Sequence, residues 1–320
     1  MKHSKKIALI VAVALIAVGT VAAFGAWAAS GFDFKKMGTV DCVTKTYAIE
    51  EAFTDISVKN AGCDIRFAPS DDGSCKIVCT ESEKISHSVT VQDNTLTVER
   101  QDQGKWYERI GIFRSSMEIT VYLPQSEYAS LHITGTSGTI DIPRDFTFGT
   151  ATLETASGDI NFFSAVRSDL SVETASGDLH IRGVGLKSLR AQTDSGDITL
   201  SSVKAEALLS MQTTSGDIEL TDVECGNATA QSTSGEITFS GLIAAEVIHI
   251  ESTSGDVDLL ECDAHSLSIR TTTGDVCGSL LTDKIFFADT ASGSVSLPKT
   301  TTGGVCEINS VSGDIRFTVK

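Results

Sequence analysis

From residue 135 onward the chain alternates apolar and polar residues in short runs, and helical spacing is absent. Apolar pairs two residues apart, such as Ile160 and Phe162, follow a recurring glycine, and a second set such as Leu170 and Val172 precedes the next one. Side chains at i and i+2 lie on one face of a β-strand. The pattern therefore predicts two short strands per repeat, each with one buried face.

The alternation is punctuated by a Ser-Gly-Asp motif that recurs every 19 or 20 residues. So regular a period without long insertions is typical of a solenoid, in which each repeat packs against its neighbours. We therefore expect an all-β, parallel β-solenoid of about ten 19- to 20-residue rungs over residues 135–320. The ten glycines of the motif are Gly138, Gly158, Gly177, Gly196, Gly216, Gly235, Gly255, Gly274, Gly293 and Gly313.

The motif itself is expected to form a corner between two strands. Glycine adopts a positive φ without steric cost, and serine and aspartate side chains accept hydrogen bonds from turn amides. A column of cation sites is the alternative, but Thr139, Glu236 and Ser294 replace the aspartate in three rungs. We therefore assign a structural role to the turn residues, whose clearest members are Gly158, Asp159, Gly177, Asp178, Gly196, Asp197, Gly216, Asp217, Gly255 and Asp256.

A hydroxyl residue precedes each motif glycine except Gly138 by three positions, for example Thr155, Thr174 and Ser232. Threonine suits strands, and stacked hydroxyls can form ladders on a flat sheet face. We expect this column to face solvent, with a contact to sugars or ordered water as the alternative.

The N-terminal 40 residues differ from the rest. Lysines precede an uncharged apolar run over residues 7–29, which is long enough to cross a bilayer as a helix. We expect residues 1–30 to form a cytoplasmic stub and transmembrane anchor, followed by a linker at 31–40. The remainder is then extracellular on a single-pass membrane protein. Ala26-Trp27-Ala28 has the form of a signal-peptidase site, so cleavage and secretion is the alternative.

Residues 41–134 form a less regular β region, which we expect to cap the solenoid because exposed strand edges invite aggregation. Within it, the run "KWYERIGIF" places aromatic residues in an expected loop. The loop either binds a partner or folds its side chains onto the domain. Its candidate contact residues are Trp106, Tyr107, Ile112 and Phe113.

Charge and candidate chemistry narrow the function. Residues 135–320 hold 26 acidic and 11 basic residues, which disfavours nucleic acid as a partner. The six histidines belong to no catalytic or metal motif, and no repeat departs from the pattern to gather an unusual charged cluster. We expect no enzyme activity and no cofactor. Cys63, Cys75 and Cys79 are expected to form either a disulfide or buried thiols.

Several segments together resemble the DUF4097 group of bacterial proteins, which are described as adhesins. They are the apolar N-terminal segment, "DISVKNAGCDIRFAPSDDG", "NTLTV", "ITVYLP" and the "TxSGDI" repeats. The resemblance implies a right-handed β-solenoid at the bacterial cell surface. We expect a non-enzymatic structural or adhesin-like module that contacts an envelope polymer or a surface protein. The alternative is a β-helix-type protein that binds or processes glycans.

Overall fold

The computed structural model describes residues 19–20, 39–40, 42–82, 85–102, 112–113 and 117–320. Of the expected membrane segment 7–29, only Gly19 and Thr20 are described, and both are helical. The described residues contain no helix long and apolar enough to span a bilayer. Trp106 and Tyr107 lie outside the described residues.

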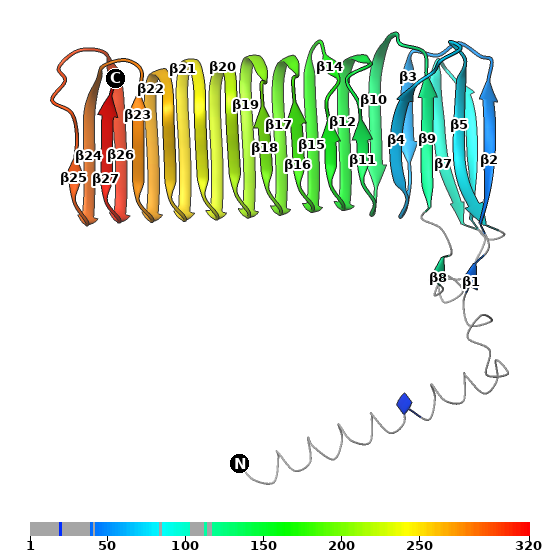
Figure 1. Cartoon of the computed structure of the whole chain (residues 1–320), viewed down its shortest axis with the longest axis horizontal. Helices are drawn as coiled ribbons and strands as arrows, with labels where there is room; N and C mark the ends of the chain where they lie inside the picture. The colour runs from blue at the N-terminus through cyan, green and yellow to red at the C-terminus, as the bar shows by residue number, and fades with distance from the viewer. Residues whose placement is uncertain (1–18, 21–38, 41, 83–84, 103–111, 114–116) are drawn as a thin grey trace.

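The described part from residue 42 onward is a rod of β-strands that stand side by side across its long axis (Figure 1). The N-terminal strands are β1 (Thr39–Val40), β2 (Cys42–Ile49), β3 (Asp55–Lys59), β4 (Asp64–Pro69), β5 (Cys75–Ser82), β6 (Ile85–Gln92), β7 (Thr95–Asp102), β8 (Ile112–Phe113), β9 (Glu118–Leu123), β10 (Glu127–Gly135) and β11 (Ile140–Ile142). The middle strands are β12 (Thr147–Ser157), β13 (Ile160–Phe162), β14 (Ala165–Val166), β15 (Asp169–Ser176), β16 (Leu179–Arg182), β17 (Gly185–Ser195), β18 (Ile198–Ser201) and β19 (Lys204–Ser215). The C-terminal strands are β20 (Ile218–Ser234), β21 (Ile237–Ser254), β22 (Val257–Thr273), β23 (Val276–Leu280), β24 (Lys284–Ser292), β25 (Val295–Ser296), β26 (Gly304–Ser312) and β27 (Ile315–Val319).

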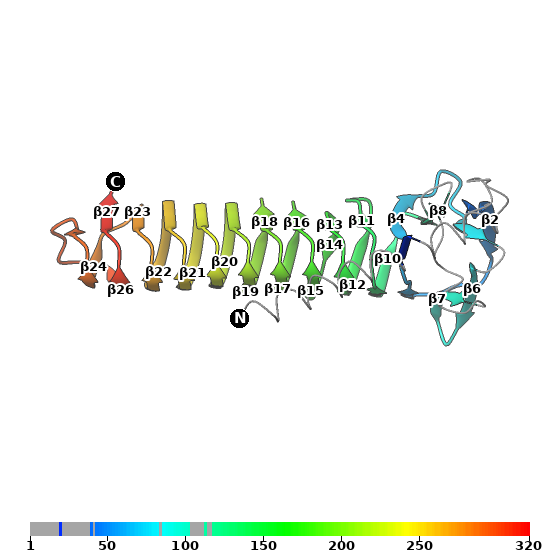
Figure 2. The same ribbon diagram turned by 90° about the horizontal axis from the view of Figure 1, so that it is seen from below.

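Each rung contributes one strand before the motif glycine and one after it, and both pair in parallel with the next rung. Figure 2 shows two rows of strands along the rod, with β15, β17 and β19 on one side and β16 and β18 on the other. The register aligns equivalent residues: Leu170 pairs with Leu189, and Leu189 pairs with Leu209. The inward side chains consequently form continuous apolar columns, as the alternation predicts.

The stretch that links the two strands also buries side chains. Val203 and Ala205 point inward there, as do Leu242 and Ala244 in a later rung. The one-residue differences between rungs are absorbed just beyond, in register shifts such as the one between Ala205 and Leu208. Each rung therefore closes around the core with three inward sets of residues, of which the sequence pattern gives two.

The C-terminal end departs from sequence order. Strand β26 pairs with β22 on one side and β24 on the other, and β27 lies in the same way between β23 and β25. The chain thus forms its outermost rung first and then returns to insert its last rung inside it. The C-terminal strands have ladder neighbours on both sides, which opposes fraying at the chain end.

The N-terminal end is threaded in a similar way. Strand β3 lies between β7 and β10, while β4 lies between β9 and β11. Beyond this rung the pairing becomes antiparallel: β6 pairs with β7, and β5 pairs with both β9 and β2. The outer edges of β7 and β9 are therefore covered by strands of the same chain.

Candidate functional site

The motif glycines stack directly on one another, and this close approach explains why they are glycine. A Cβ atom added at Gly177, Gly196 or Gly216 would overlap the carbonyl oxygen of the preceding motif glycine. None of these three has φ in the left-handed range, whereas Gly158 and Gly255 do, at +133° and +129°. The expectation that glycine is needed for positive φ therefore holds at some corners only. The stacking distance between rungs requires it at all of them.

The motif aspartates link successive rungs. Asp159 Oδ1 accepts a hydrogen bond from the Asp178 amide at 2.9 Å, and Asp178 Oδ1 accepts one from the Asp197 amide at 2.9 Å. The same bond joins Asp197 to Asp217 at 2.8 Å and Asp256 to Asp275 at 2.8 Å. One oxygen of each carboxylate is thus occupied by backbone. The described residues contain no group of three or more His, Cys, Asp or Glu side chains placed to hold a metal ion.

The hydroxyl column is buried, so the expectation that it faces solvent is wrong. Thr174 and Thr193 are 2% and 1% exposed, and each hydroxyl donates to the carbonyl of a motif glycine, at 3.3 Å and 3.2 Å. These threonines lie an even number of residues from the inward apolar residues of the same strand, so their side chains point to the same face and lie inside the corner. Where serine replaces threonine, at Ser232, Ser252 and Ser310, the buried hydroxyl has no partner among the described residues.

Two other expectations concern loop and cysteine residues. Ile112 and Phe113 form β8, which pairs in parallel with β1; their side chains are not described. Cys63, Cys75 and Cys79 are buried free thiols, and burial raises the pKa of Cys75 and Cys79 to about 12. Such thiols stay protonated and unreactive at neutral pH.

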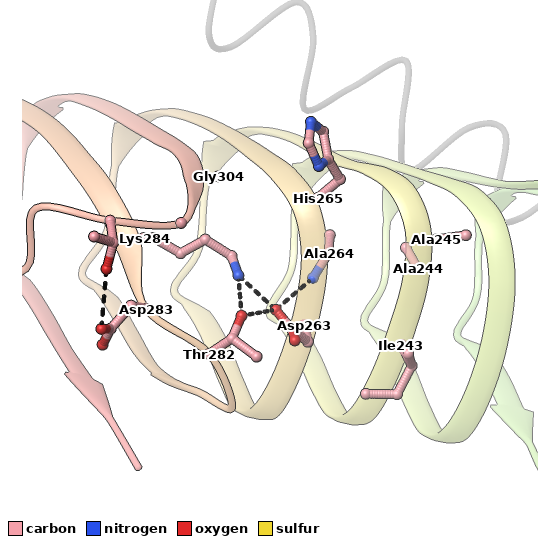
Figure 3. A pocket seen from close by; sticks show the side chains of 12 residues that line it. Ile243, Ala244, Ala245, Asp263, Ala264, His265, Thr282, Asp283, Lys284 and Gly304 are labelled. Atoms are coloured by element: carbon pink, nitrogen blue, oxygen red, sulfur yellow. Dashed lines mark hydrogen bonds and ion pairs between the residues drawn. The ribbon is translucent and has the colours of Figure 1, made fainter.

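A hollow lies near the C-terminal end of the described surface, where the last rung inserts out of order (Figure 3). It is an open groove of about 510 Å³. Small residues leave the space, and polar side chains surround it. The lining consists of Ile243, Ala244, Ala245, Asp263, Ala264, His265, Thr282, Asp283, Lys284, Thr302, Gly303 and Gly304.

A buried ion pair lies at this groove. The Lys284 ammonium is 2.6 Å from Asp263 Oδ1 and also donates to the Thr282 hydroxyl, as Figure 3 shows. The Lys284 side chain is 3% exposed and that of Asp263 is 21% exposed. Asp263 Oδ1 also accepts the Ala264 amide and the Thr282 hydroxyl, both at 2.9 Å. These additional bonds offset part of the free energy needed to remove two charges from water.

Two adjacent glycines allow the inserted rung to enter here. A Cβ at Gly303 would overlap the Asp283 carbonyl, and one at Gly304 would overlap the His265 carbonyl. Gly303 also has a φ of +97°. The Thr300 hydroxyl donates to the Lys284 carbonyl and holds the returning chain against the outermost rung. The groove is therefore a consequence of the threading, and the regular repeat does not contain it.

The groove presents mainly hydrogen-bond acceptors. Lys284 is buried and paired with Asp263, so Asp283 leaves the pocket with a net negative charge. Thr282, Thr302 and His265 add further polar side chains. Such a lining suits a ligand that carries hydroxyl or ammonium donors, and it disfavours phosphate or carboxylate groups.

A second hollow of about 310 Å³ lies over the regular repeat, on the face formed by β10, β12, β15 and β17. Its lining includes Glu154, Glu173 and Asp194, which are exposed, and two buried threonines of the hydroxyl column. It is acidic like the first groove, but it lacks a buried charged pair.

Asp263 and Lys284 were not expected from the sequence, and the expectation that no rung gathers an unusual charged cluster is wrong at this point. The glycine spacing gives no signal, because Gly274, Gly293 and Gly313 keep intervals of 19 and 20 residues. The available signal was compositional. A lysine begins the strand "KIFFADTAS", and "PKTTTGG" places a proline and two glycines at the entry to the next strand.

Comparison with known proteins finds one family and several solved structures. The DUF4097 family, described as Toastrack DUF4097, matches residues 53–209 and 188–320. A structure from Bacteroides fragilis, described as a "putative adhesin", is 16% identical with a TM-score of 0.36, covering 87% of this chain and 97% of its own. Another "putative adhesin", from Parabacteroides distasonis, is 12% identical with a TM-score of 0.49, covering 88% and 100%.

A third structure, also from Parabacteroides distasonis, is described as a "putative lipid binding protein". It is 16% identical with a TM-score of 0.43, covering 88% of this chain and 98% of its own. No curated protein matches the chain. Because the family match spans nearly all of the rod, the chain belongs to the DUF4097 (Toastrack) family.

Proposed function

We propose that this protein is a non-enzymatic binding module of the bacterial cell envelope, held at the membrane by residues 7–29. The rod presents its C-terminal groove to an envelope polymer that carries free amino groups and hydroxyls. The right-handed winding and the capping role of the antiparallel N-terminal strands are part of the same proposal.

The observation that carries the proposal is the acceptor-rich groove at the point where the repeat is interrupted. Its volume of about 510 Å³ falls in the range of ligand sites. The groove is open at the surface, so a chain-like ligand can lie across it without being enclosed. The exposed Asp283 supplies a carboxylate for ammonium or hydroxyl donors, while three donors fix Asp263 beside it.

Charge supports the choice of polymer. The formal net charge of the whole chain is −17, and 26 acidic against 11 basic residues lie in residues 135–320. A rod of this charge repels polymers rich in phosphate or uronate, while it attracts polymers with ammonium groups. The attraction is electrostatic and weakens as salt is added.

The test is co-sedimentation of the full chain, purified in detergent, with insoluble glycan. One sample of glycan carries free amino groups, and a matched sample has them acetylated. We expect the free-amine polymer to retain the protein at low salt and to release it as salt rises. Equal retention by both samples would contradict the proposal, as would retention by neither.

A further inference from the structure

The C-terminal end of the rod leaves a strand edge open. β24 pairs with β26 and β25 pairs with β27, and within the described residues neither outer strand has a second neighbour. At the N-terminal end the corresponding edges are covered by β5 and β6. The outermost strand there, β2, pairs only with β5 within the described residues, so each end of the rod has a strand with one unpaired edge. The C-terminal end is distinguished by its side chains.

Apolar side chains gather at this open end. Nine large hydrophobic residues are well exposed in the described part of the chain, and five of them fall between residues 281 and 311. Phe286 and Ala288, which point toward the core, are only half-buried there. Exposed apolar groups gathered at one place on a surface mark interaction sites. The five residues are Leu281, Phe287, Val295, Val305 and Val311.

Strand β24 lacks the features that protect open edges. Its sequence, "KIFFADTAS", contains no proline or glycine. Asp289 is its one exposed charged residue, since Lys284 is buried in the ion pair with Asp263. On the other side of the rung, Pro298 follows the two-residue strand β25 and removes a backbone donor. An added strand therefore pairs with β24.

We propose that the occupant of this edge is β24 of a second copy of the chain, paired antiparallel about a two-fold axis at Phe287. In this register Phe287 faces its own counterpart, Phe286 lies opposite Ala288, and Ile285 lies opposite Asp289. Phe286 and Ala288 both pair inward with buried residues of β26, so the apolar core continues from one rod into the other.

Charge and parity favour this register over two alternatives. A two-fold axis at Asp289 would place two carboxylates directly opposite each other, which is unfavourable. An axis between two residues would pair inward side chains with outward ones. With the axis at Phe287, two exposed aromatic rings meet and each Asp289 faces an isoleucine. Pairing of β24 with the unpaired edge of β2 of another copy would instead give a head-to-tail arrangement, in which Phe287→Cys copies would not cross-link to each other.

The interface is small, because one strand of nine residues provides the main-chain contacts. Interfaces at the low end of the size range form weak complexes, so we expect dissociation at roughly micromolar to tens of micromolar concentration. The dimer joins rods through the ends that lack the N-terminal segment. It does not depend on the groove ligand.

Cysteine cross-linking of the full chain in detergent tests the register. Phe287→Cys places two thiols opposite each other on the axis, and we expect a covalent dimer upon mild oxidation. Ile285→Cys should give no more dimer than the unsubstituted chain with its native cysteines. A mixture of Ile285→Cys and Asp289→Cys copies should cross-link to each other. Equal cross-linking of Phe287→Cys and Ile285→Cys would overturn the proposal.

Sedimentation of the same detergent-solubilised chain tests the association itself. Phe287→Lys places like charges at the axis without disturbing the core, since Phe287 is 59% exposed, and it should abolish the dimer. Val43→Lys is the matched control, at a 69% exposed residue near the other end, and should leave the dimer intact. Asp283→Asn should also leave it intact. A monomer at about 100 µM unsubstituted chain would overturn the proposal, because a weak standard interface associates at that concentration.

Discussion

Gly196→Ala tests the physical reason for the repeated glycine. The new Cβ would overlap the Gly177 carbonyl oxygen and lie 2.6 Å from its carbonyl carbon. Both atoms belong to backbone, so neighbouring rungs must separate locally. Such a separation strains the bonds that join these two rungs, from Gly177 N to Ser195 O, at 3.2 Å, and from Asp197 N to Asp178 Oδ1, at 2.9 Å. With overpacking added, we expect a loss of about 3 kcal/mol in the free energy of unfolding.

Two other glycines in the preceding rung provide controls. Gly185 has open space around its Cβ position and no left-handed φ, so Gly185→Ala should be neutral or stabilise by about 0.5 kcal/mol. Gly183 also has open space but a φ of +67°, so Gly183→Ala should lose about 1 kcal/mol. Urea unfolding followed by far-UV circular dichroism measures all three. If Gly196→Ala unfolded at the same urea concentration as Gly185→Ala, the stacking argument would be refuted.

Two pairs of substitutions test the corner by the same urea unfolding measurement, and a fifth substitution tests the sheet face by melting temperature. Asp217→Ala removes the acceptor of the Glu236 amide, at 2.7 Å, and should lower the free energy of unfolding by about 1 kcal/mol. Asp194→Ala, at an exposed carboxylate without such a bond in the described chain, should change it little. Equal losses in the two variants would count against the inter-rung bond. Thr213→Val should lower the free energy of unfolding by about 1 kcal/mol, because the Thr213 hydroxyl donates to the Gly196 carbonyl. Ser232→Ala should be neutral or stabilising, because that buried hydroxyl has no partner among the described residues. A larger loss in Ser232→Ala than in Thr213→Val would contradict this reasoning. Burial, with Glu236, Asp256 and Asp275 nearby, raises the pKa of Asp258, so its ionisation opposes folding. Asp258→Asn should therefore raise the melting temperature at neutral pH, with the gain vanishing below the unfolded-state pKa; a gain that persists in acid would show another cause.

The rung architecture is readable from the sequence because two periodicities agree. The glycine interval gives the length of a rung, and the alternation of Leu170, Val172 and their equivalents gives the inward faces. The same parity includes Thr174, so the burial of the hydroxyl column was available from the pattern. The strand propensity of threonine led to the expectation of a solvent-exposed face. The position of Thr174, two residues after the inward Val172, places its side chain inside instead.

The order of the terminal rungs could not be read in this way. Val276 pairs with both Val257 and Ile315, and Val295 also pairs with Ile315. Because every rung offers similar apolar residues in the same columns, a rung fits equally well between several neighbours. The groove arises from this threading, and so its residues Asp263 and Lys284 have no counterpart in the repeat pattern. Gly303 and Gly304 were the local indication that the chain is constrained there.

The proposed binding site lies at the interruption of the repeat, and the repeating faces are expected not to bind the polymer. The direct measurement compares Asp283→Asn with Asp194→Asn, two exposed carboxylates in the two hollows, for retention of the full chain by free-amine glycan. An exposed ion pair contributes up to about 1 kcal/mol, so Asp283→Asn should weaken binding roughly fivefold while Asp194→Asn binds like the unsubstituted chain. Equal weakening by both substitutions, or a loss confined to Asp194→Asn, would contradict this account.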